Sequence, residues 1–199
     1  EIPVVANGFE ASVAPAGTSR LDVLAESLIV SGLDGWDTIS AVGNLAALTA
    51  ITMNGGGGGD TILGSNGNDL LNGGAGDDFV DGQQGADTAF LGDGNVHFQW
   101  DPGDSNDVVE GQAGNDTLDF NGSNIGENMQ VSANGERVRF TRNIASIVMD
   151  LDGVELIDVR TFGGADNVVV DDLAGTDLET VHVDLDAFGG ADDGQPDTV

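Results

Sequence analysis

The sequence predicts an all-β parallel solenoid, and three features carry that prediction. Residues 55–90 repeat with a period of nine. Each repeat is rich in glycine in its first half and has an apolar residue near its end, as expected for a tight turn followed by a short strand with one inward side chain. At 199 residues and 39% hydrophobic residues, the chain has the length and apolar content of one domain or one solenoid segment.

The repeat keeps the same residue types at fixed places. Its four units are GGGGGDTIL, GSNGNDLLN, GGAGDDFVD and GQQGADTAF. The sixth place is aspartate and the eighth is apolar, giving Asp60, Asp69, Asp78 and Asp87 followed by Ile62, Leu71, Val80 and Ala89. A flexible glycine-rich linker is the alternative interpretation. A linker, however, has no reason to hold aspartate and the apolar residue in phase over 36 residues.

This G-G-x-G-x-D-x-U-x pattern resembles the RTX family, also called haemolysin-type calcium-binding repeats. The resemblance implies a right-handed parallel β-roll or β-helix solenoid with glycine–aspartate calcium turns. It is specific for residues 32–40 and 55–119. Aspartate-poor segments like residues 120–199 follow repeat blocks in large RTX-like bacterial surface proteins, so the resemblance extends loosely over most of the chain.

The spacing also has a direct chemical consequence. Two units make one coil, so Asp60 is expected one rung, roughly 4.8 Å, from Asp78, and Asp69 from Asp87. Carboxylates at that distance repel each other unless a cation lies between them. Carboxylates and turn carbonyls together supply the six to eight hard oxygens that Ca²⁺ prefers to Mg²⁺.

The chain divides into three expected regions. Residues 1–31 are expected to be N-terminal capping strands, with short strands at 21–24 and 27–31. Residues 32–119 are expected to form the calcium-binding β-roll. There, residues 41–54 read as apolar rungs, with a helix over 45–51 as the lesser alternative, and 91–110 depart from the pattern. Residues 120–199 are expected to continue as a β-helix with few calcium turns, with strands at 136–142, 144–151, 154–159, 167–170 and 178–185.

The predicted metal ligands are side chains and turn carbonyls of the repeats. At residue 96 a valine replaces the aspartate, and Asp93 is the expected substitute there. In residues 163–166 and 189–192 the turn motif is abbreviated, and neither stretch is included. The predicted ligands for several Ca²⁺ ions are Asp37, Gly56, Gly58, Asp60, Gly67, Asp69, Gly74, Gly76, Asp78, Gly85, Asp87, Asp93, Asp107, Gly114 and Asp116.

Composition excludes several classes of function. Five arginines face 35 acidic residues, for a net charge of −30, so the chain has no basic patch for nucleic acid or an anionic membrane surface. There is no cysteine and no run of 18 apolar residues, which excludes disulfides and a membrane-spanning helix. The chain begins without Met and ends in Asp197-Thr198-Val199, like the opening of another strand, so we expect a piece of a longer or processed protein.

No enzymatic motif stands out. His97 and His182 lie outside any H-E-x-x-H motif, no G-x-S-x-G elbow is present, and no lysine is available. We interpret His97 as an outward-facing residue without a ligand role, and Trp36 and Trp100 as corner packing rather than sugar platforms. The cluster Arg137, Arg139 and Arg142 is expected to pair with carboxylates, with an anionic-ligand or partner site as the alternative.

The sequence therefore predicts a non-enzymatic, calcium-binding structural or adhesive solenoid. It would be secreted or displayed at a bacterial surface and would fold on binding Ca²⁺ outside the cell. Its partners would be calcium ions and other parts of a larger surface protein. The second hypothesis is a folding and export module of a larger type I secreted enzyme or toxin, for which flanking catalytic motifs would be the discriminating feature. The third is self-association, with exposed apolar rungs stacking end to end into a fibre.

Overall fold

The computed structural model describes residues 2–6, 9–13, 27–41, 50–187, 189–190 and 193–199, and its regular structure is almost entirely β-strand. The strands form two sheets. Sheet A has eleven strands in the spatial order β17 (Asn167–Val170), β13 (Asn128–Asn134), β14 (Arg137–Arg142), β15 (Ile147–Asp152), β11 (Val108–Ala113), β9 (Thr88–Asp93), β7 (Leu70–Ala75), β5 (Ala50–Gly57), β3 (Ser27–Asp34), β1 (Ile2–Ala6) and β2 (Phe9–Val13). Sheet B has seven, in the order β18 (Thr180–Ala187), β16 (Leu156–Phe162), β12 (Thr117–Asn121), β10 (His97–Trp100), β8 (Phe79–Asp81), β6 (Thr61–Leu63) and β4 (Thr38–Ser40).

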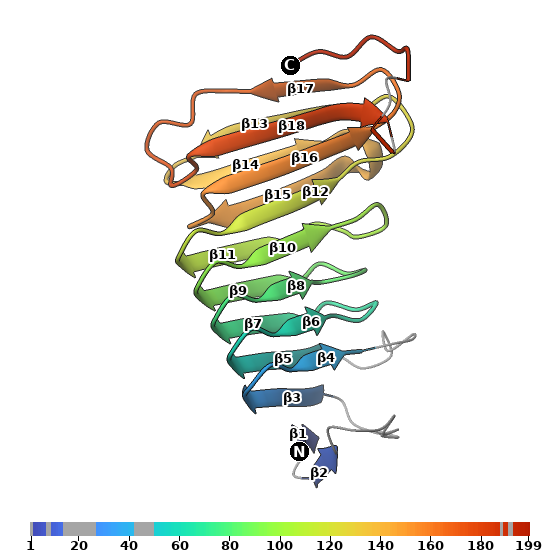
Figure 1. Ribbon diagram of the computed structural model, residues 1–199. Coiled ribbons are helices and arrows are strands. Elements are labelled where there is room, and N and C mark those ends of the chain that lie inside the picture. Colours follow the sequence, from blue (N-terminus) through green and yellow to red (C-terminus); the bar gives the residue numbers. More distant parts are fainter. Residues whose placement is uncertain (1, 7–8, 14–26, 42–49, 188, 191–192) are drawn as a thin grey trace.

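The two sheets are joined as stacked coils (Figure 1). In the repeat region each strand of sheet A is followed by one of sheet B, and neighbouring strands within each sheet are parallel. Thr52 pairs with Leu70, and Leu70 with Thr88, so a coil contains 18 residues. The prediction that two nine-residue units make one coil of a parallel all-β solenoid is confirmed. The right-handed sense of the coil stays a prediction.

The core fills the space between the sheets. The apolar residue of each unit faces inward, as predicted: Ile62, Leu71, Val80 and Ala89 are all 0% exposed. Phe98 is likewise buried. Trp100 stacks on Phe120 with ring centroids 4.2 Å apart, and Phe120 packs on Phe140 at 4.3 Å. This aromatic column links the repeats to the strands that follow them.

The turns on the two sides of a coil differ in length. The six residues 82–87 connect β8 to β9, as the repeat predicts, but only residues 76–78 connect β7 to β8. On that side the strand of sheet A continues through the first two glycines of the next unit, because Gly74 stays in ladder register with Gly56 and Gly92. Strands of sheet A therefore have six to eight residues in this region, whereas β6 and β8 have three.

The β-helix predicted to continue after residue 120 contains an antiparallel insertion that the sequence analysis does not include. Strand β14 pairs antiparallel with both β13 and β15. The reversal occurs in the two-residue loop Gly135-Glu136, between the paired residues Asn134 and Arg137, where Gly135 has a φ of 72° and allows a tight hairpin turn. The hairpin is inserted in one long coil, since Val109 of β11 pairs with Leu151 of β15 in parallel. Strand β17 matches the expected strand at 167–170, while β15, β16 and β18 each begin two or three residues later than expected.

The N-terminal region is described in part. Strand β3 covers the expected strand at 27–31, and it pairs antiparallel with β1, which pairs antiparallel with β2. The expected strand at 21–24 and most of the alternative helix at 45–51 lie outside the described residues. Ile51 itself lies in strand β5.

Candidate calcium sites

The aspartates of the repeats form two ladders, one at each edge of the solenoid. Ladder 1 precedes the strands of sheet B and ladder 2 those of sheet A. Ladder 1 contains Asp37, Asp60, Asp78 and Asp116, with Val96 at the place of a fifth aspartate, and ladder 2 contains Asp69, Asp87 and Asp107. The sequence prediction that Asp60 stacks with Asp78, and Asp69 with Asp87, is confirmed by direct bonds between these pairs.

One hydrogen bond recurs along both ladders. The backbone N–H of Asp37, Asp60, Asp69 and Asp87 donates to Oδ1 of the aspartate in the next coil. In ladder 1 the Asp60 amide reaches Asp78 at 2.7 Å, and the Asp37 amide reaches Asp60 at 2.8 Å. In ladder 2 the Asp69 amide reaches Asp87 at 2.7 Å, and the Asp87 amide reaches Asp107 at 2.8 Å. The bond uses one carboxylate oxygen and leaves the other available.

That second oxygen has no partner in most of the ladder. Oδ2 is buried and lacks a hydrogen bond in Asp37, Asp60, Asp78, Asp87 and Asp116 of the repeats, and also in Asp166. A buried carboxylate oxygen without a partner is costly, so each of these positions fits a bound cation better than it fits an unpaired charge. The residues present therefore agree with the calcium sites that the sequence predicts.

Backbone carbonyls approach the same places as these oxygens. The point where a Cβ would stand on Gly55 lies 2.5 Å from Oδ2 of Asp60 and 2.4 Å from the carbonyl oxygen of Gly73. The corresponding point on Gly73 lies 2.6 Å from Oδ2 of Asp78 and 2.3 Å from the carbonyl oxygen of Leu91. Glycine at the first place thus leaves room for a carboxylate and a carbonyl from the next coil to converge. Such oxygens are the ligands that Ca²⁺ takes.

The second glycine of a unit is required by the backbone itself. Gly74 has a φ of 110°, and a Cβ there would lie 2.1 Å from the carbonyl oxygen of Gly56 one coil away. Most glycines that are predicted to bind calcium through their carbonyls have a positive φ, namely Gly56, Gly58, Gly74, Gly76, Gly85 and Gly114. Gly67 does not have a positive φ.

Two predicted ligands, and the place where Val96 replaces an aspartate, differ from the rest. Both oxygens of Asp69 accept hydrogen bonds from Ser65, at 2.6 Å from its N–H and 3.2 Å from its hydroxyl. Val96 is fully buried in the core, and only its amide takes part in the ladder, donating to Oδ1 of Asp116 at 2.9 Å. Asp93 is exposed at the end of β9, three residues before that place. Its role as a substitute ligand stays a prediction.

Burial shifts the pKa values of these carboxylic acids upward. Desolvation raises the pKa of Asp87 to about 8, with further contributions from the carboxylates of Asp107, Asp69 and Asp104. Desolvation likewise raises the pKa of Asp107 to about 7 and that of Asp116 to about 6. Neutralisation by a proton or by a cation is therefore favoured at both edges.

Sequence reasoning missed several acidic residues at these edges. Asp104 is held by the Asp101 amide at 2.7 Å, and burial raises its pKa to about 7, with added contributions from Asp81, Asp101 and Asp107. The signal was the two extra residues in 100–110, which were read only as an irregularity. Glu155 was also missed, although its Oε2 accepts the Asp116 amide at 2.7 Å and continues ladder 1.

Within the described ranges, no group of three or more acidic or histidine side chains converges in a way that could hold a metal ion. Ladder neighbours contribute one or two carboxylates to any one place. Backbone carbonyls would therefore supply the remaining oxygens of each calcium site. The glycines at the turns leave room for these carbonyls because they have no side chain.

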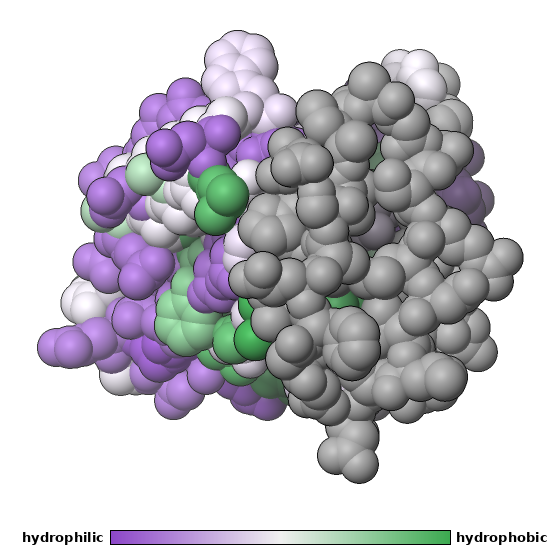
Figure 2. Space-filling view, turned by 90° about the horizontal axis from the view of Figure 1, so that it is seen from below, coloured by the Kyte–Doolittle hydropathy of each residue, from purple (hydrophilic) through white to green (hydrophobic). Residues whose placement is uncertain are grey.

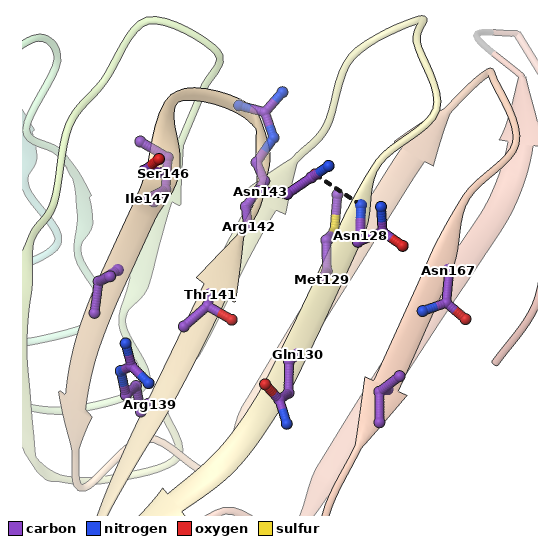
Figure 3. A pocket seen from close by; sticks show the side chains of 12 residues that line it. Asn128, Met129, Gln130, Arg139, Thr141, Arg142, Asn143, Ser146, Ile147 and Asn167 are labelled. Carbon is purple, nitrogen blue, oxygen red and sulfur yellow. Dashed lines mark hydrogen bonds between the residues drawn. The ribbon is translucent and has the colours of Figure 1, made fainter.

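The three arginines of strand β14 have different surroundings: Arg137 and Arg139 lie on its outer face, and Arg142 is buried on the other face. Arg137 pairs with Glu110 at 2.9 Å and with Asp150 at 2.8 Å, and buried Arg142 pairs with Glu127, so the expected charge pairing is confirmed for these two. Arg139 is exposed and lies in a shallow pocket of about 540 Å³ on sheet A, beside Gln130 and Thr141 (Figure 3). The alternative of an anionic ligand therefore concerns Arg139 alone.

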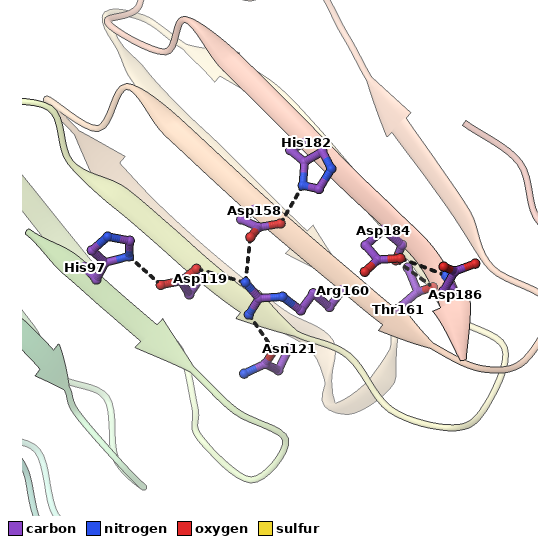
Figure 4. A network of polar contacts seen from close by, with 9 residues as sticks. All are labelled: His97, Asp119, Asn121, Asp158, Arg160, Thr161, His182, Asp184 and Asp186. Atoms are coloured by element: carbon purple, nitrogen blue, oxygen red, sulfur yellow. Dashed lines mark hydrogen bonds and ion pairs between the residues drawn. The ribbon is translucent and has the colours of Figure 1, made fainter. Parts of the chain in front are cut away.

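The two histidines belong to a surface network on sheet B (Figure 4). His97 contacts Asp119 through Nδ1 at 2.8 Å, and His182 contacts Asp158 in the same way at 2.8 Å. Arg160 lies between the two aspartates, 2.6 Å from Asp158 and 3.5 Å from Asp119. His97 faces outward as predicted, with a side chain 55% exposed.

The two tryptophans have different environments. Trp100 is fully buried, and its indole N–H donates to the carbonyl of Ser105 at 2.9 Å, in agreement with packing at a corner. Trp36 is 89% exposed, so the prediction of corner packing is wrong for it. Trp36 occupies the place before the ladder aspartate, the same place as exposed Asp77, where a side chain points away from the core.

No helix in the part of the chain that the structure describes is long and apolar enough to cross a membrane. No curated protein and no solved structure matches the chain. A family model does match: that of the RTX calcium-binding nonapeptide repeat, in four copies over residues 54–95 and 103–124. These residues contain most of both carboxylate ladders, and such repeats bind Ca²⁺. Residues 54–95 and 103–124, which form the central coils of the solenoid, are therefore identified as RTX calcium-binding nonapeptide repeats.

Proposed function

We propose that the protein is a secreted structural or adhesive module that is unfolded at low calcium and folds when Ca²⁺ binds outside the cell. Calcium binding and a β-roll are properties of its repeats. The extracellular setting, the folding switch and the structural purpose are the proposal. It is supported chiefly by one observation, namely the buried Oδ2 atoms of the ladder aspartates that have no hydrogen-bond partner.

These oxygens make folding dependent on a cation. Each ladder brings ionised carboxylates within one rung of each other and buries them, in a chain whose net charge is already −30. Bound calcium supplies the positive charge that offsets this repulsion. Asp37, Asp60, Asp78, Asp87 and Asp116 would hold it through Oδ2. In all of these except Asp37, Oδ1 stays bonded to an amide of the neighbouring coil. The ligands come from different coils, so the site forms only as the chain folds.

The coupling suits a protein that is exported before it folds. A ligand that binds only the folded state, at a hundred times its dissociation constant, stabilises that state by about 2.7 kcal/mol per site. Several such sites would separate the folded from the unfolded state across a difference in calcium concentration. The chain has no cysteine, so disulfides do not contribute to its stability outside the cell.

We further propose that the module binds rather than catalyses. Both histidines are engaged with aspartates on the outer face of sheet B, which supports a surface role for them.

We also propose self-association at the C-terminal end of sheet B. There β18 pairs only with β16 among the described strands, and Val181 and Val183 are partly buried against the core. Light scattering in calcium that stays monomeric at high protein concentration would contradict the self-association.

The central experiment is a titration of Ca²⁺ into EDTA-stripped protein, followed by circular dichroism, with Mg²⁺ as the matched control. A cooperative gain of β-signal with calcium and not with magnesium is expected. A protein that is already folded in EDTA and does not respond to calcium would exclude the folding switch.

A further inference from the structure

A third stack of acidic side chains lies outside the matched repeats. Glu127 immediately precedes β13 and Asp166 immediately precedes β17, and these two strands are parallel neighbours in register at Asn128 and Asn167. Asp197 precedes Thr198, which forms a parallel bridge with Asn167. The three acidic residues therefore stand one above another at the starts of three successive parallel segments.

The bonds in this stack reproduce those of the repeat ladders. The Glu127 amide donates to Oδ1 of Asp166 at 2.8 Å, and the Asp166 amide donates to Oδ1 of Asp197 at 2.9 Å. The strand that follows closes the same ring: the Asn167 amide donates to the Glu127 carbonyl at 2.9 Å. In ladder 1 the equivalent bond runs from the Phe79 amide to the Asp60 carbonyl at 2.8 Å.

The lowest member of the stack is neutralised by the protein itself. Glu127 is completely buried and accepts hydrogen bonds from Arg142 Nε at 2.7 Å and from the Ser123 hydroxyl at 2.7 Å. Arg142 is itself 4% exposed. A cationic side chain thus takes the place that a metal ion would take beside Glu127.

The middle member has no such partner. Asp166 is 2% exposed, and its Oδ2 is buried without a hydrogen bond. The Thr161 hydroxyl is close enough to this carboxylate to lower its pKa, and it also donates to the Asp184 carbonyl at 3.4 Å. Gly164, two residues before Asp166, has a φ of 119°, as the glycines two residues before Asp60 and Asp78 do at 125° and 132°. Its amide is held by Oδ2 of Asp193 at 2.6 Å, which brings one more carboxylate to the turn.

We propose that Asp166 is a ligand of a further calcium ion, in a site that lies beyond the repeats and includes the carboxylate of Asp197 or Asp193 and carbonyls of the 163–166 turn. The donors are all hard oxygens, which favours Ca²⁺ over softer metals. The site differs from the repeat sites because its coils are 39 and 31 residues apart rather than 18. It extends calcium-dependent order to the end of the chain that carries the antiparallel hairpin.

The test is the number of calcium ions bound by the full chain, counted by equilibrium dialysis at saturating Ca²⁺. Asp166→Asn keeps an oxygen that accepts the Glu127 amide and removes the charge. It is expected to bind one ion fewer than the unsubstituted chain. Asp177→Asn, which changes an exposed aspartate of the same region, is the matched control and is expected to leave the count unchanged.

Equal counts for Asp166→Asn and the unsubstituted chain would overturn the inference while leaving the repeat sites intact. Absence of calcium binding by the unsubstituted chain would instead overturn the proposed function as well. If circular dichroism shows that Asp166→Asn does not fold in calcium, Asp197→Asn replaces it. That variant changes only the outermost carboxylate, and Asp193→Asn is measured beside it. One ion fewer for either variant at a fixed free calcium concentration supports the site, whereas an unchanged count for both refutes it.

Discussion

The amide of Asp60 donates to Oδ1 of Asp78 at 2.7 Å, while Oδ2 of the same Asp78 is buried without a partner. One carboxylate thus performs two tasks, because one oxygen fixes the register of the coils and the other is available to a cation. Substitutions that separate these two tasks test the proposed mechanism directly.

Asp78→Asn removes the charge of a ladder carboxylate but keeps an oxygen acceptor for the Asp60 amide. The calcium midpoint of folding is expected to rise about tenfold, since a hydrogen bond or ligand contact involving a charged group contributes roughly 1.5–3 kcal/mol. Circular dichroism at increasing free calcium measures the midpoint. Asp34→Asn, at an exposed aspartate of β3, should leave it unchanged, and equal midpoints for the two variants would argue against Asp78 as a ligand.

Gly74→Ala tests the close approach of neighbouring coils. The new Cβ would lie 2.1 Å from the Gly56 carbonyl oxygen at a backbone φ of 110°, so a loss of at least about 3 kcal/mol of stability is expected. Gly135→Ala is the matched control, because Gly135 also has a positive φ, 72°, but nothing lies within 4 Å of its added Cβ. It should cost only about 1 kcal/mol. Urea unfolding in saturating calcium compares them, and similar losses would contradict the steric explanation.

Lowering the pH should stabilise the folded state in EDTA but should weaken the folding that calcium induces. Burial raises the pKa of Asp87 to about 8 and that of Asp107 to about 7, from an ordinary value of 3.8. In EDTA the folded state then binds more protons than the unfolded state, so its stability increases as the pH falls from about 8 towards about 4. Calcium needs the ionised carboxylates, so the calcium midpoint of folding should rise over the same window.

Circular dichroism of the EDTA-stripped protein and calcium titrations, both at several pH values in that window, check the two halves of this prediction. The β-signal in EDTA is expected to increase as the pH falls from about 8 to about 5, and a β-signal that stays constant or decreases would show that protonation of the ladder carboxylates does not favour the folded state.

Arg142→Ala should destabilise the C-terminal half of the solenoid. It leaves the completely buried Glu127 without its cation and removes a guanidinium that lies 5.3 Å from the ring centroid of Trp100. Breaking a buried pair from one side costs about 3–5 kcal/mol. Arg139→Ala, on the exposed face of the same strand, should change stability by no more than about 0.5 kcal/mol. Thermal unfolding in calcium compares the variants, and equal melting temperatures would show that the buried pair contributes nothing net.

The coiled region was predictable because two residue types repeat in it with the same nine-residue period. The aspartate at every ninth residue and the apolar residue two places later fix both the 18-residue coil and the inward face, and both are found at Asp60 and Ile62. The differences begin where one of these signals is lost. At Val96 the apolar side chain fills the core, so the coil continues although the carboxylate is absent.

The hairpin and the acidic stack were missed for a different reason. Glycine at the first place of the loop Gly135-Glu136 is a hairpin signal, but the strands on either side of it have lengths that also fit the rungs of a regular solenoid. Because the hairpin lies between them, Glu127 and Asp166 are 39 residues apart in the sequence. A search for short sequence repeats does not reveal such a separation. Only the three-dimensional register of Asn128 with Asn167 brings them together.

The ladder hydrogen bonds also give the solenoid a direction. In every ladder bond between acidic residues, the N–H comes from the coil nearer the N-terminus and the carboxylate from the coil nearer the C-terminus. Removing coils from the N-terminal side therefore uncovers carboxylate oxygens, which water or ions solvate readily. Removing them from the C-terminal side instead uncovers turn amides and takes away the acceptors that held them. Each coil thus serves as the template on which its predecessor is ordered, so truncation from the two ends should be unequal in its consequences.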